Sequence, residues 1–147
     1  MSPTSELPLR HRDLALTSTH AEVLAFQLGA WLNQLLADGD TFLTVAMDST
    51  NRFVQFATGD GDYLRAETTG DIFLEPRHQL GPTEHDRLAR FGWNPPQADE
   101  VFVGNHWKMW TPPDVANAAQ LAALTLCTVC GLSDATLADS SVRAGLL

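Results

Sequence analysis

Three short apolar runs between residues 41 and 69 form the most regular pattern in the chain. They are rich in β-branched and aromatic residues, and two polar clusters, at 48–51 and 59–62, separate them. Runs of this length with turn residues between them are typical of antiparallel strands joined by hairpins. The pattern therefore predicts a three-stranded antiparallel meander.

Alternate residues of the second and third runs fall into an apolar and a more polar set. Because side chains of a strand point alternately to its two faces, each set predicts one face of the sheet. Val54, Phe56, Leu64 and Ala66 are expected to face the core under the helices. The opposite face is expected to be at least half open, and it carries Phe53, Gln55, Tyr63, Arg65 and Glu67.

A helical pattern precedes the meander, from about residue 19 to residue 38. Thr19 and Glu22 have the spacing of a capping box at its start, and Gly39 suits a left-handed cap at its end. The apolar residues recur at steps of three and four, as in an amphipathic helix: Leu24, Leu28, Trp31, Leu32, Leu35 and Leu36.

A second helix and a fourth strand are expected after an irregular connection at 70–80. The helix would run from a Thr83 cap to about Arg90, where Gly92 ends it. The strand would lie at 105–110, with Trp107 and Met109 facing the core and His106 and Lys108 facing outward. A short strand or a loop is expected at 101–103.

The last helix is predicted to begin at Pro112 or Pro113 and to end before Gly131. It has no charged residue after Asp114 and is apolar nearly all round, which indicates burial on more than one side. Leu121 and Leu124 lie outside its main stripe and are the candidate residues of a homodimer interface. The alternative is that the N-terminal helix or the C-terminal tail covers them.

These elements predict an α+β fold with the order helix, three-stranded antiparallel meander, helix, strand, helix. The helices would pack mainly on one face of a twisted sheet. Residues 1–17 are expected to be a flexible arm, 18–132 a single domain, and 133–147 a polar, frayed tail.

Composition narrows the classes of partner. The 147 residues are 44% hydrophobic and 18% charged, as in a globular domain, and the net charge is −9. Nucleic acid and anionic membrane surfaces are unfavourable partners for such a charge, whereas basic or amphipathic polypeptides are favourable. Residues 1–20 lack the apolar segment of a signal peptide, so the cytoplasm is the expected location.

The residues most often used in catalysis are not arranged for it. Cys127 and Cys130 have CxxC spacing but lie at the C-terminal end of a helix, where the dipole disfavours a thiolate, so core packing is the main interpretation and a redox or metal role the alternative. The five histidines show no HxxxH or HExxH spacing. The Gly-Asp-Gly-Asp run at 59–62 predicts a hairpin turn rather than a calcium loop. We therefore expect no enzyme activity, cofactor or metal.

Two of the four tryptophans, Trp93 and Trp110, stand beside prolines at the ends of predicted elements. Exposed aromatic side chains at such positions can anchor a partner protein. Both are therefore candidate binding residues, with burial in the core as the alternative.

The order of these segments resembles the YbjN and type III secretion chaperone-like superfamily, in particular the actinobacterial domains called TY-Chap. The resemblance covers about 19–132 and rests on Phe53-Val54-Gln55-Phe56, Tyr63-Leu64-Arg65-Ala66-Glu67, the segment from Leu88 to Trp93 with Pro95-Pro96, the segment from Asn105 to Trp110, and the long apolar helix. It implies a twisted antiparallel sheet with helices packed on it, often in a homodimer, and non-catalytic binding of peptides or proteins. It implies no active site.

Three functional hypotheses follow. The first is a chaperone-like module that binds an extended client on the open sheet face or at a sheet edge. The second is a dimeric structural or regulatory subunit without a peptide groove. The third, a remote alternative, is a small-molecule binder that uses a cleft between the sheet and residues 93–110.

Overall fold

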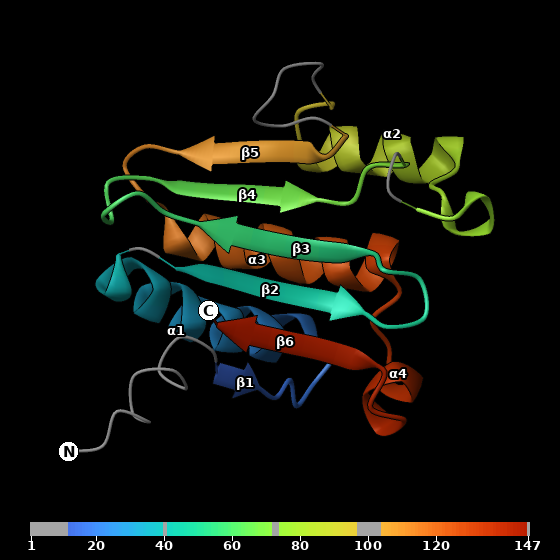
Figure 1. The fold of residues 1–147 in the computed structure, drawn as a ribbon, viewed down its shortest axis with the longest axis horizontal. Coiled ribbons are helices and arrows are strands. Elements are labelled where there is room, and N and C mark those ends of the chain that lie inside the picture. Colours follow the sequence, from blue (N-terminus) through green and yellow to red (C-terminus); the bar gives the residue numbers. More distant parts are fainter. Residues whose placement is uncertain (1–11, 40, 72–73, 97–103, 147) are drawn as a thin grey trace, which may run out of the picture.

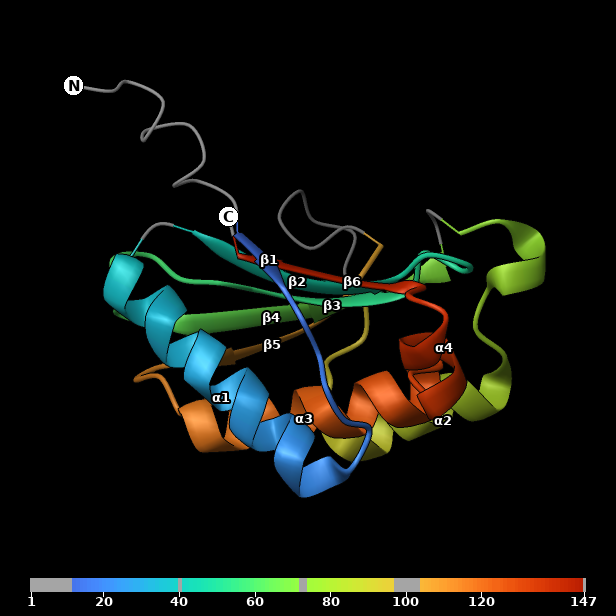
Figure 2. The ribbon, with the colours of Figure 1, turned by 90° about the horizontal axis from the view of Figure 1, so that it is seen from below.

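The computed structural model describes residues 12–39, 41–71, 74–96 and 104–146. These residues form one six-stranded antiparallel sheet with helices on one of its faces (Figures 1 and 2). The strand order is β1-β6-β2-β3-β4-β5. The strands are β1 (Arg12–Leu14), β2 (Phe42–Met47), β3 (Phe53–Ala57), β4 (Leu64–Thr68), β5 (His106–Trp110) and β6 (Val142–Leu146).

The helices are α1 (Ala21–Asp38), α2 (Pro82–Phe91), α3 (Val115–Thr125) and α4 (Asp134–Ala138). A 3-10 turn, η4 (Pro76–His78), precedes α2, and a π-helical turn, η5 (Leu126–Cys130), continues α3. Figure 2 shows α1 and α3 side by side beneath the sheet, and nothing from the described helices on its opposite face. The α+β class, the central meander and the one-sided helical layer are therefore confirmed.

The residues of the meander that were predicted to face the core do so. Val45 of β2 pairs with Val54 of β3, and Phe56 of β3 pairs with Ala66 of β4. These residues lie on the helix-covered face and are buried. With α1 and α3 they form a single hydrophobic core, to which Leu24, Leu28, Leu32 and Leu35 of α1 contribute fully buried side chains.

The fourth strand exists, but its predicted facing is reversed. His106 pairs with Thr68 and Trp110 pairs with Leu64, so both lie on the helix-covered face, where they are buried. Met109 instead is 41% exposed on the other face. The reason is the pairing with β4: residues directly opposite its buried Leu64 and Thr68 share their face of the sheet. The predicted segment 101–103 lies outside the described residues.

Both chain ends contribute to the sheet. The tail expected to fray contains α4 and β6, and β6 lies between β1 and β2. Its alternating Val142, Ala144 and Leu146 are at least half-buried, which gives this short strand a core-facing side. The last part of the expected arm, Arg12–Leu14, pairs with β6, while residues 1–11 lie outside the described part.

Two predicted helix caps are corrected. The Thr19 hydroxyl donates to Asp134 at 2.7 Å instead of capping α1. His20 takes the N-cap position of α1, and its side chain makes no capping hydrogen bond. Gly81, rather than Thr83, is the N-cap of α2, and its backbone N–H donates to Glu84 at 3.0 Å. The glycine caps are confirmed, with positive φ at Gly39 and Gly92.

Candidate functional site

An open apolar groove separates α1 from α3 on the outer surface of the helical layer. The two helices run antiparallel (Figure 1), and small residues line both walls. A methyl group on Gly29 would lie 3.8 Å from Cβ of Ala119 and 3.8 Å from a methyl group of Val115, so the helices approach closely at this point. The groove has a volume of about 960 Å³. Its lining residues are Ala21, Glu22, Ala25, Phe26, Gly29, Ala30, Asn33, Val115, Ala116, Ala119, Gln120, Ala123 and Leu124.

Large apolar side chains project into solvent at this groove. Phe26 is 81% exposed and Leu124 is 43% exposed, and both line the groove. Val23, in the same turn of α1 as Phe26, is 47% exposed. Contiguous exposed apolar side chains of this size mark interaction surfaces more often than single ones do.

The walls of the groove carry no positive charge, because neither α1 nor α3 contains Lys or Arg. Glu22 lines the groove near the start of α1, Asp38 ends α1, and Asp114 caps the start of α3. Asp114 accepts a hydrogen bond from the backbone N–H of Asn117 at 3.1 Å. The groove is thus an apolar surface with acidic residues near both ends.

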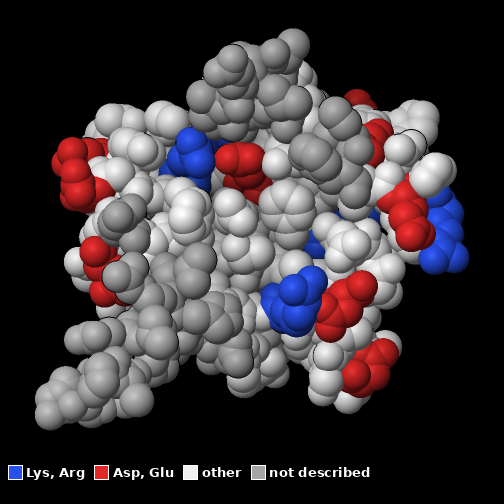
Figure 3. Space-filling model, in the orientation of Figure 1, with Lys and Arg blue, Asp and Glu red and all other residues white. Residues whose placement is uncertain are grey.

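The helix-free face of the sheet carries the residues predicted for client binding, and each is half-buried: Phe53, Gln55, Tyr63, Arg65 and Glu67. Several of their polar groups are engaged within the protein. Thr44 donates to Gln55 at 3.0 Å, Arg65 pairs with Glu67 at 3.5 Å, and Asn105 donates to Glu67 at 3.0 Å. The ring of Tyr63 lies over Gly59 in the adjoining turn. Figure 3 looks onto this face and shows basic and acidic side chains next to each other.

Neither predicted tryptophan anchor is exposed. Trp93 is 4% and Trp110 is 9% exposed. The indole N–H of Trp93 donates to the Thr125 hydroxyl at 2.9 Å, and that of Trp110 donates to Asn117 at 2.9 Å. Both side chains are therefore buried against α3, the alternative to an exposed anchor. The cleft of the small-molecule hypothesis includes residues 97–103, which lie outside the described part of the chain.

The two leucines predicted for a dimer interface differ in position. Leu121 is 8% exposed and belongs to the hydrophobic core of its own chain, whereas Leu124 points into the groove and is 43% exposed. Only Leu124 therefore offers substantial surface to a partner.

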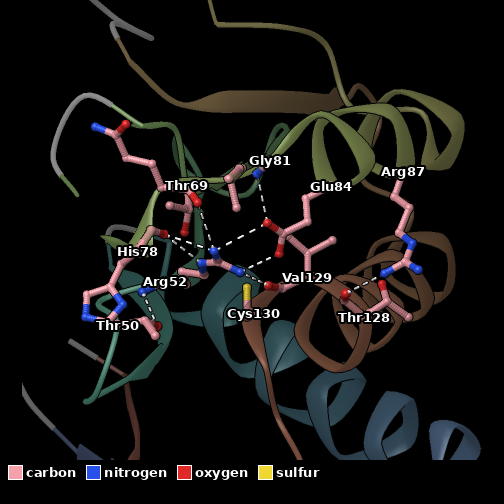
Figure 4. A network of polar contacts seen from close by, with 12 residues as sticks. Thr50, Arg52, Thr69, His78, Gly81, Glu84, Arg87, Thr128, Val129 and Cys130 are labelled. Atoms are coloured by element: carbon pink, nitrogen blue, oxygen red, sulfur yellow. Dashed lines mark hydrogen bonds and ion pairs between the residues drawn. The ribbon is translucent and has the colours of Figure 1, made fainter. Parts of the chain in front are cut away.

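A polar cluster centred on Arg52 joins the β2–β3 turn to the segments around α2 (Figure 4). Its guanidinium donates to the Glu84 carboxylate at 2.5 Å, to the carbonyl of His78 at 2.9 Å and to the carbonyl of Val129 at 2.8 Å. The Arg52 side chain is 15% exposed and that of Glu84 is 25% exposed. These acceptors lie in α2, η4 and η5, so the cluster connects the β2–β3 turn to all three elements.

Two histidines lie close together beside Asp71, and the two cysteines lie at the end of α3. His85 contacts Asp71 at 2.9 Å, and its ring lies 5.4 Å from the ring of buried His106. Burial lowers the pKa of His106. Burial also raises the pKa of Cys127, and it raises the pKa of Cys130 to about 12, so both remain thiols. Among the described residues, no group of three His, Cys, Asp or Glu is placed to hold a metal ion.

The groove was not predicted from the sequence, although a signal was present. Phe26 lies outside the apolar stripe of α1, and small residues occur at helical spacing on both helices: Ala25, Gly29, Ala116, Ala119 and Ala123. An aromatic residue on the polar side of an amphipathic helix indicates an exposed apolar position. The pairing of α1 with α3, which brings these residues together, depends on the tertiary fold.

One of three comparisons with known proteins found a match. Residues 22–141 match the sequence model of a family described as T3SS (YopN, CesT) and YbjN peptide-binding chaperone 3. Searches of curated proteins and of solved structures found no match. Among the described helices, none is long and apolar enough to cross a membrane. The family match covers most of the fold, from α1 to the end of α4, and the chain therefore belongs to this family of peptide-binding chaperone domains.

Proposed function

We propose that this protein is a non-catalytic, chaperone-like module that binds a peptide or protein client in the groove between α1 and α3. The observation that carries the proposal is Phe26, which is 81% exposed at the edge of an apolar groove of about 960 Å³. A phenylalanine left in water forgoes about 2 kcal/mol of burial free energy, which a bound client could supply. The family description, a peptide-binding chaperone, supports the same role. The cytoplasm stays a prediction from the sequence.

The helix-free sheet face remains a second candidate surface for an extended client. Phe42 and Met109 are each 41% exposed, and they occupy the ends of one cross-strand row with Ala57 and Arg65 between them. This row is less apolar than the groove, because Arg65 interrupts it. We therefore rank the groove first.

The alternative function is a dimeric structural or regulatory subunit in which a second copy covers the groove. Phe26 and Leu124 offer a projecting side chain, and the small residues of the groove offer a depression. A two-fold interface needs such a self-complementary patch. Sedimentation at micromolar concentration tests this alternative, and Leu124→Lys should split any dimer that forms through this face.

Selection from a random peptide library displayed on phage tests the proposed function. Wild-type protein should enrich related peptides, and Phe26→Ser should lose them because it removes the exposed ring. Phe42→Ser, a matched change on the sheet face, should retain them. Peptides lost with Phe42→Ser and retained with Phe26→Ser would move the site to the sheet, and no enrichment by any form would contradict a binding function.

A further inference from the structure

The shape of the groove bears on the conformation of its client. It follows α1 from Ala21 to Asn33 and α3 from Val115 to Leu124. At 1.5 Å per residue the α1 wall is about 18 Å long, or about three turns of helix. A shallow apolar trough of this length, between two antiparallel helices, has the dimensions that a third helix needs to pack.

The backbone of the groove walls also favours a helical client over an extended one. An extended peptide is bound most readily by a sheet edge, which supplies free backbone N–H and C=O groups. Both walls here are helices, whose backbone groups bond within the helix. The lining offers only three polar side chains, Glu22, Asn33 and Gln120. A helical client satisfies its own backbone and needs no such partners.

Charge distinguishes the possible helices. With Glu22, Asp38 and Asp114 near its ends and no Lys or Arg on α1 or α3, the groove favours a client with positive charge. A second copy would bring the same carboxylates and a net charge of −9 toward their equivalents, which disfavours self-association here.

Resting on the proposed binding function, we infer that the α1–α3 groove binds an amphipathic helix whose polar face is basic. The apolar stripe of that helix packs against Phe26, Leu124 and the small residues of the floor. Its Lys or Arg side chains lie over the rims, within reach of Glu22 at one end and Asp38 or Asp114 at the other.

Three labelled peptides of about 18 residues test this inference by fluorescence anisotropy with the full chain. The first has leucines at helical spacing and lysines elsewhere, the second replaces each lysine by glutamate, and the third has the composition of the first in an order without an apolar stripe. The first should bind at least about tenfold more tightly than either of the others. Raising the salt concentration should weaken its binding.

Two variants separate the apolar from the charged contribution. Phe26→Ser should weaken binding of the lysine peptide at least about tenfold, and Glu22→Gln should weaken it about two- to fivefold with a smaller salt dependence. Both positions are exposed, and thermal unfolding should confirm that each variant is folded. Phe42→Ser on the sheet face is the control and should bind like the wild type.

The inference is overturned if the lysine and glutamate peptides bind equally, if the peptide without a stripe binds as well as the helical one, or if the protein is a dimer whose formation depends on Phe26. In the first two cases, the proposed function would still hold if the binding of peptides from the phage library is lost with Phe26→Ser. If neither probe peptides nor library peptides bind, both fail.

Discussion

Arg52 and Glu84 form an ion pair, with 2.5 Å between Nη1 and Oε2, that joins the β2–β3 turn to the first turn of α2. The same guanidinium donates to the backbone carbonyls of His78, Gln79 and Val129. Removing it would leave a mostly buried carboxylate and several carbonyls without their donor. Arg52→Met should therefore lower the free energy of unfolding by about 3 kcal/mol in urea denaturation.

Arg77 provides the matched control for Arg52. It pairs with Glu75 at 3.1 Å, but its side chain is 77% exposed. An exposed pair contributes little because water and salt screen it, so Arg77→Met should change the free energy of unfolding by less than about 0.5 kcal/mol. Equal effects of the two substitutions would show that the Arg52 cluster does not hold α2 to the sheet.

Gly29 is a position where a methyl group should stabilise the protein. It lies inside α1, and its added Cβ would meet Ala119 and Val115 at an ordinary contact distance of 3.8 Å. Because glycine costs more backbone entropy in a helix than alanine, Gly29→Ala should raise the free energy of unfolding by about 0.5–1 kcal/mol. Thermal unfolding measures this as a higher midpoint.

Gly70 should respond in the opposite direction. A Cβ there would lie 1.2 Å from the carbonyl oxygen of Gly104, so Gly70→Ala would force two backbone segments apart. We expect a lower thermal midpoint for Gly70→Ala. A stabilised Gly70→Ala would contradict the close approach of β4 to the start of β5.

His106 should make stability depend on pH. Burial lowers the pKa of this ring in the folded state below the value of 6.5 of an exposed histidine, and His85 also lowers it, while the Thr69 carbonyl and Asp71 raise it. Just below pH 6.5 the unfolded chain therefore binds more protons at this residue than the folded protein does. The contribution of His106 is fully present above that pH and is lost as the pH falls through 6.5 toward the folded pKa.

The test is urea denaturation between about pH 5.5 and about pH 7.5, where histidines titrate. His106→Asn removes the titration and keeps a side-chain donor for the Thr69 carbonyl, which Nδ1 contacts at 3.0 Å. The variant should lose less stability than the wild type on acidification. An identical loss in both proteins would exclude His106 as its source.

Both cysteines should react slowly in the folded protein. Burial raises the pKa of Cys127 and raises that of Cys130 to about 12, so almost no thiolate is present near neutral pH. Labelling with iodoacetamide should be slow for both thiols in the native state, slowest for Cys130, and fast for both in urea. Rapid labelling of Cys130 in the native protein would contradict its position in the core.

The meander and the helical stripes could be predicted because their periods are local properties of the sequence. Residues such as Val54, Phe56, Leu64 and Ala66 alternate over several positions, and the alternation fixes the face of each strand. The tail strand was missed because Ala144 and Gly145 give it a weak signal. The pairing with β2 and β1, which stabilises it, involves distant residues.

The candidate site was harder to predict because its residues come from segments that are distant in the sequence. Nearby prolines made Trp93 and Trp110 candidate anchors, with burial as the alternative. Trp93 is buried because it finds a hydrogen-bond partner in Thr125, 32 positions away. The groove requires α1 and α3 to lie together, and no local pattern states this. The position of Phe26 on the polar side of α1 and the spacing of the small residues on both helices could have been recognised in the sequence.

Photo-cross-linking from position 26 tests the central claim most directly. Benzoylphenylalanine replaces Phe26 in one sample and Phe42 in the control, and each is irradiated with a peptide selected from the library. A groove-bound client predicts a covalent adduct of protein and peptide from position 26 and none from position 42. An adduct from position 42 alone, or a cross-link between two copies of the protein in place of the peptide adduct, would contradict a client bound between α1 and α3.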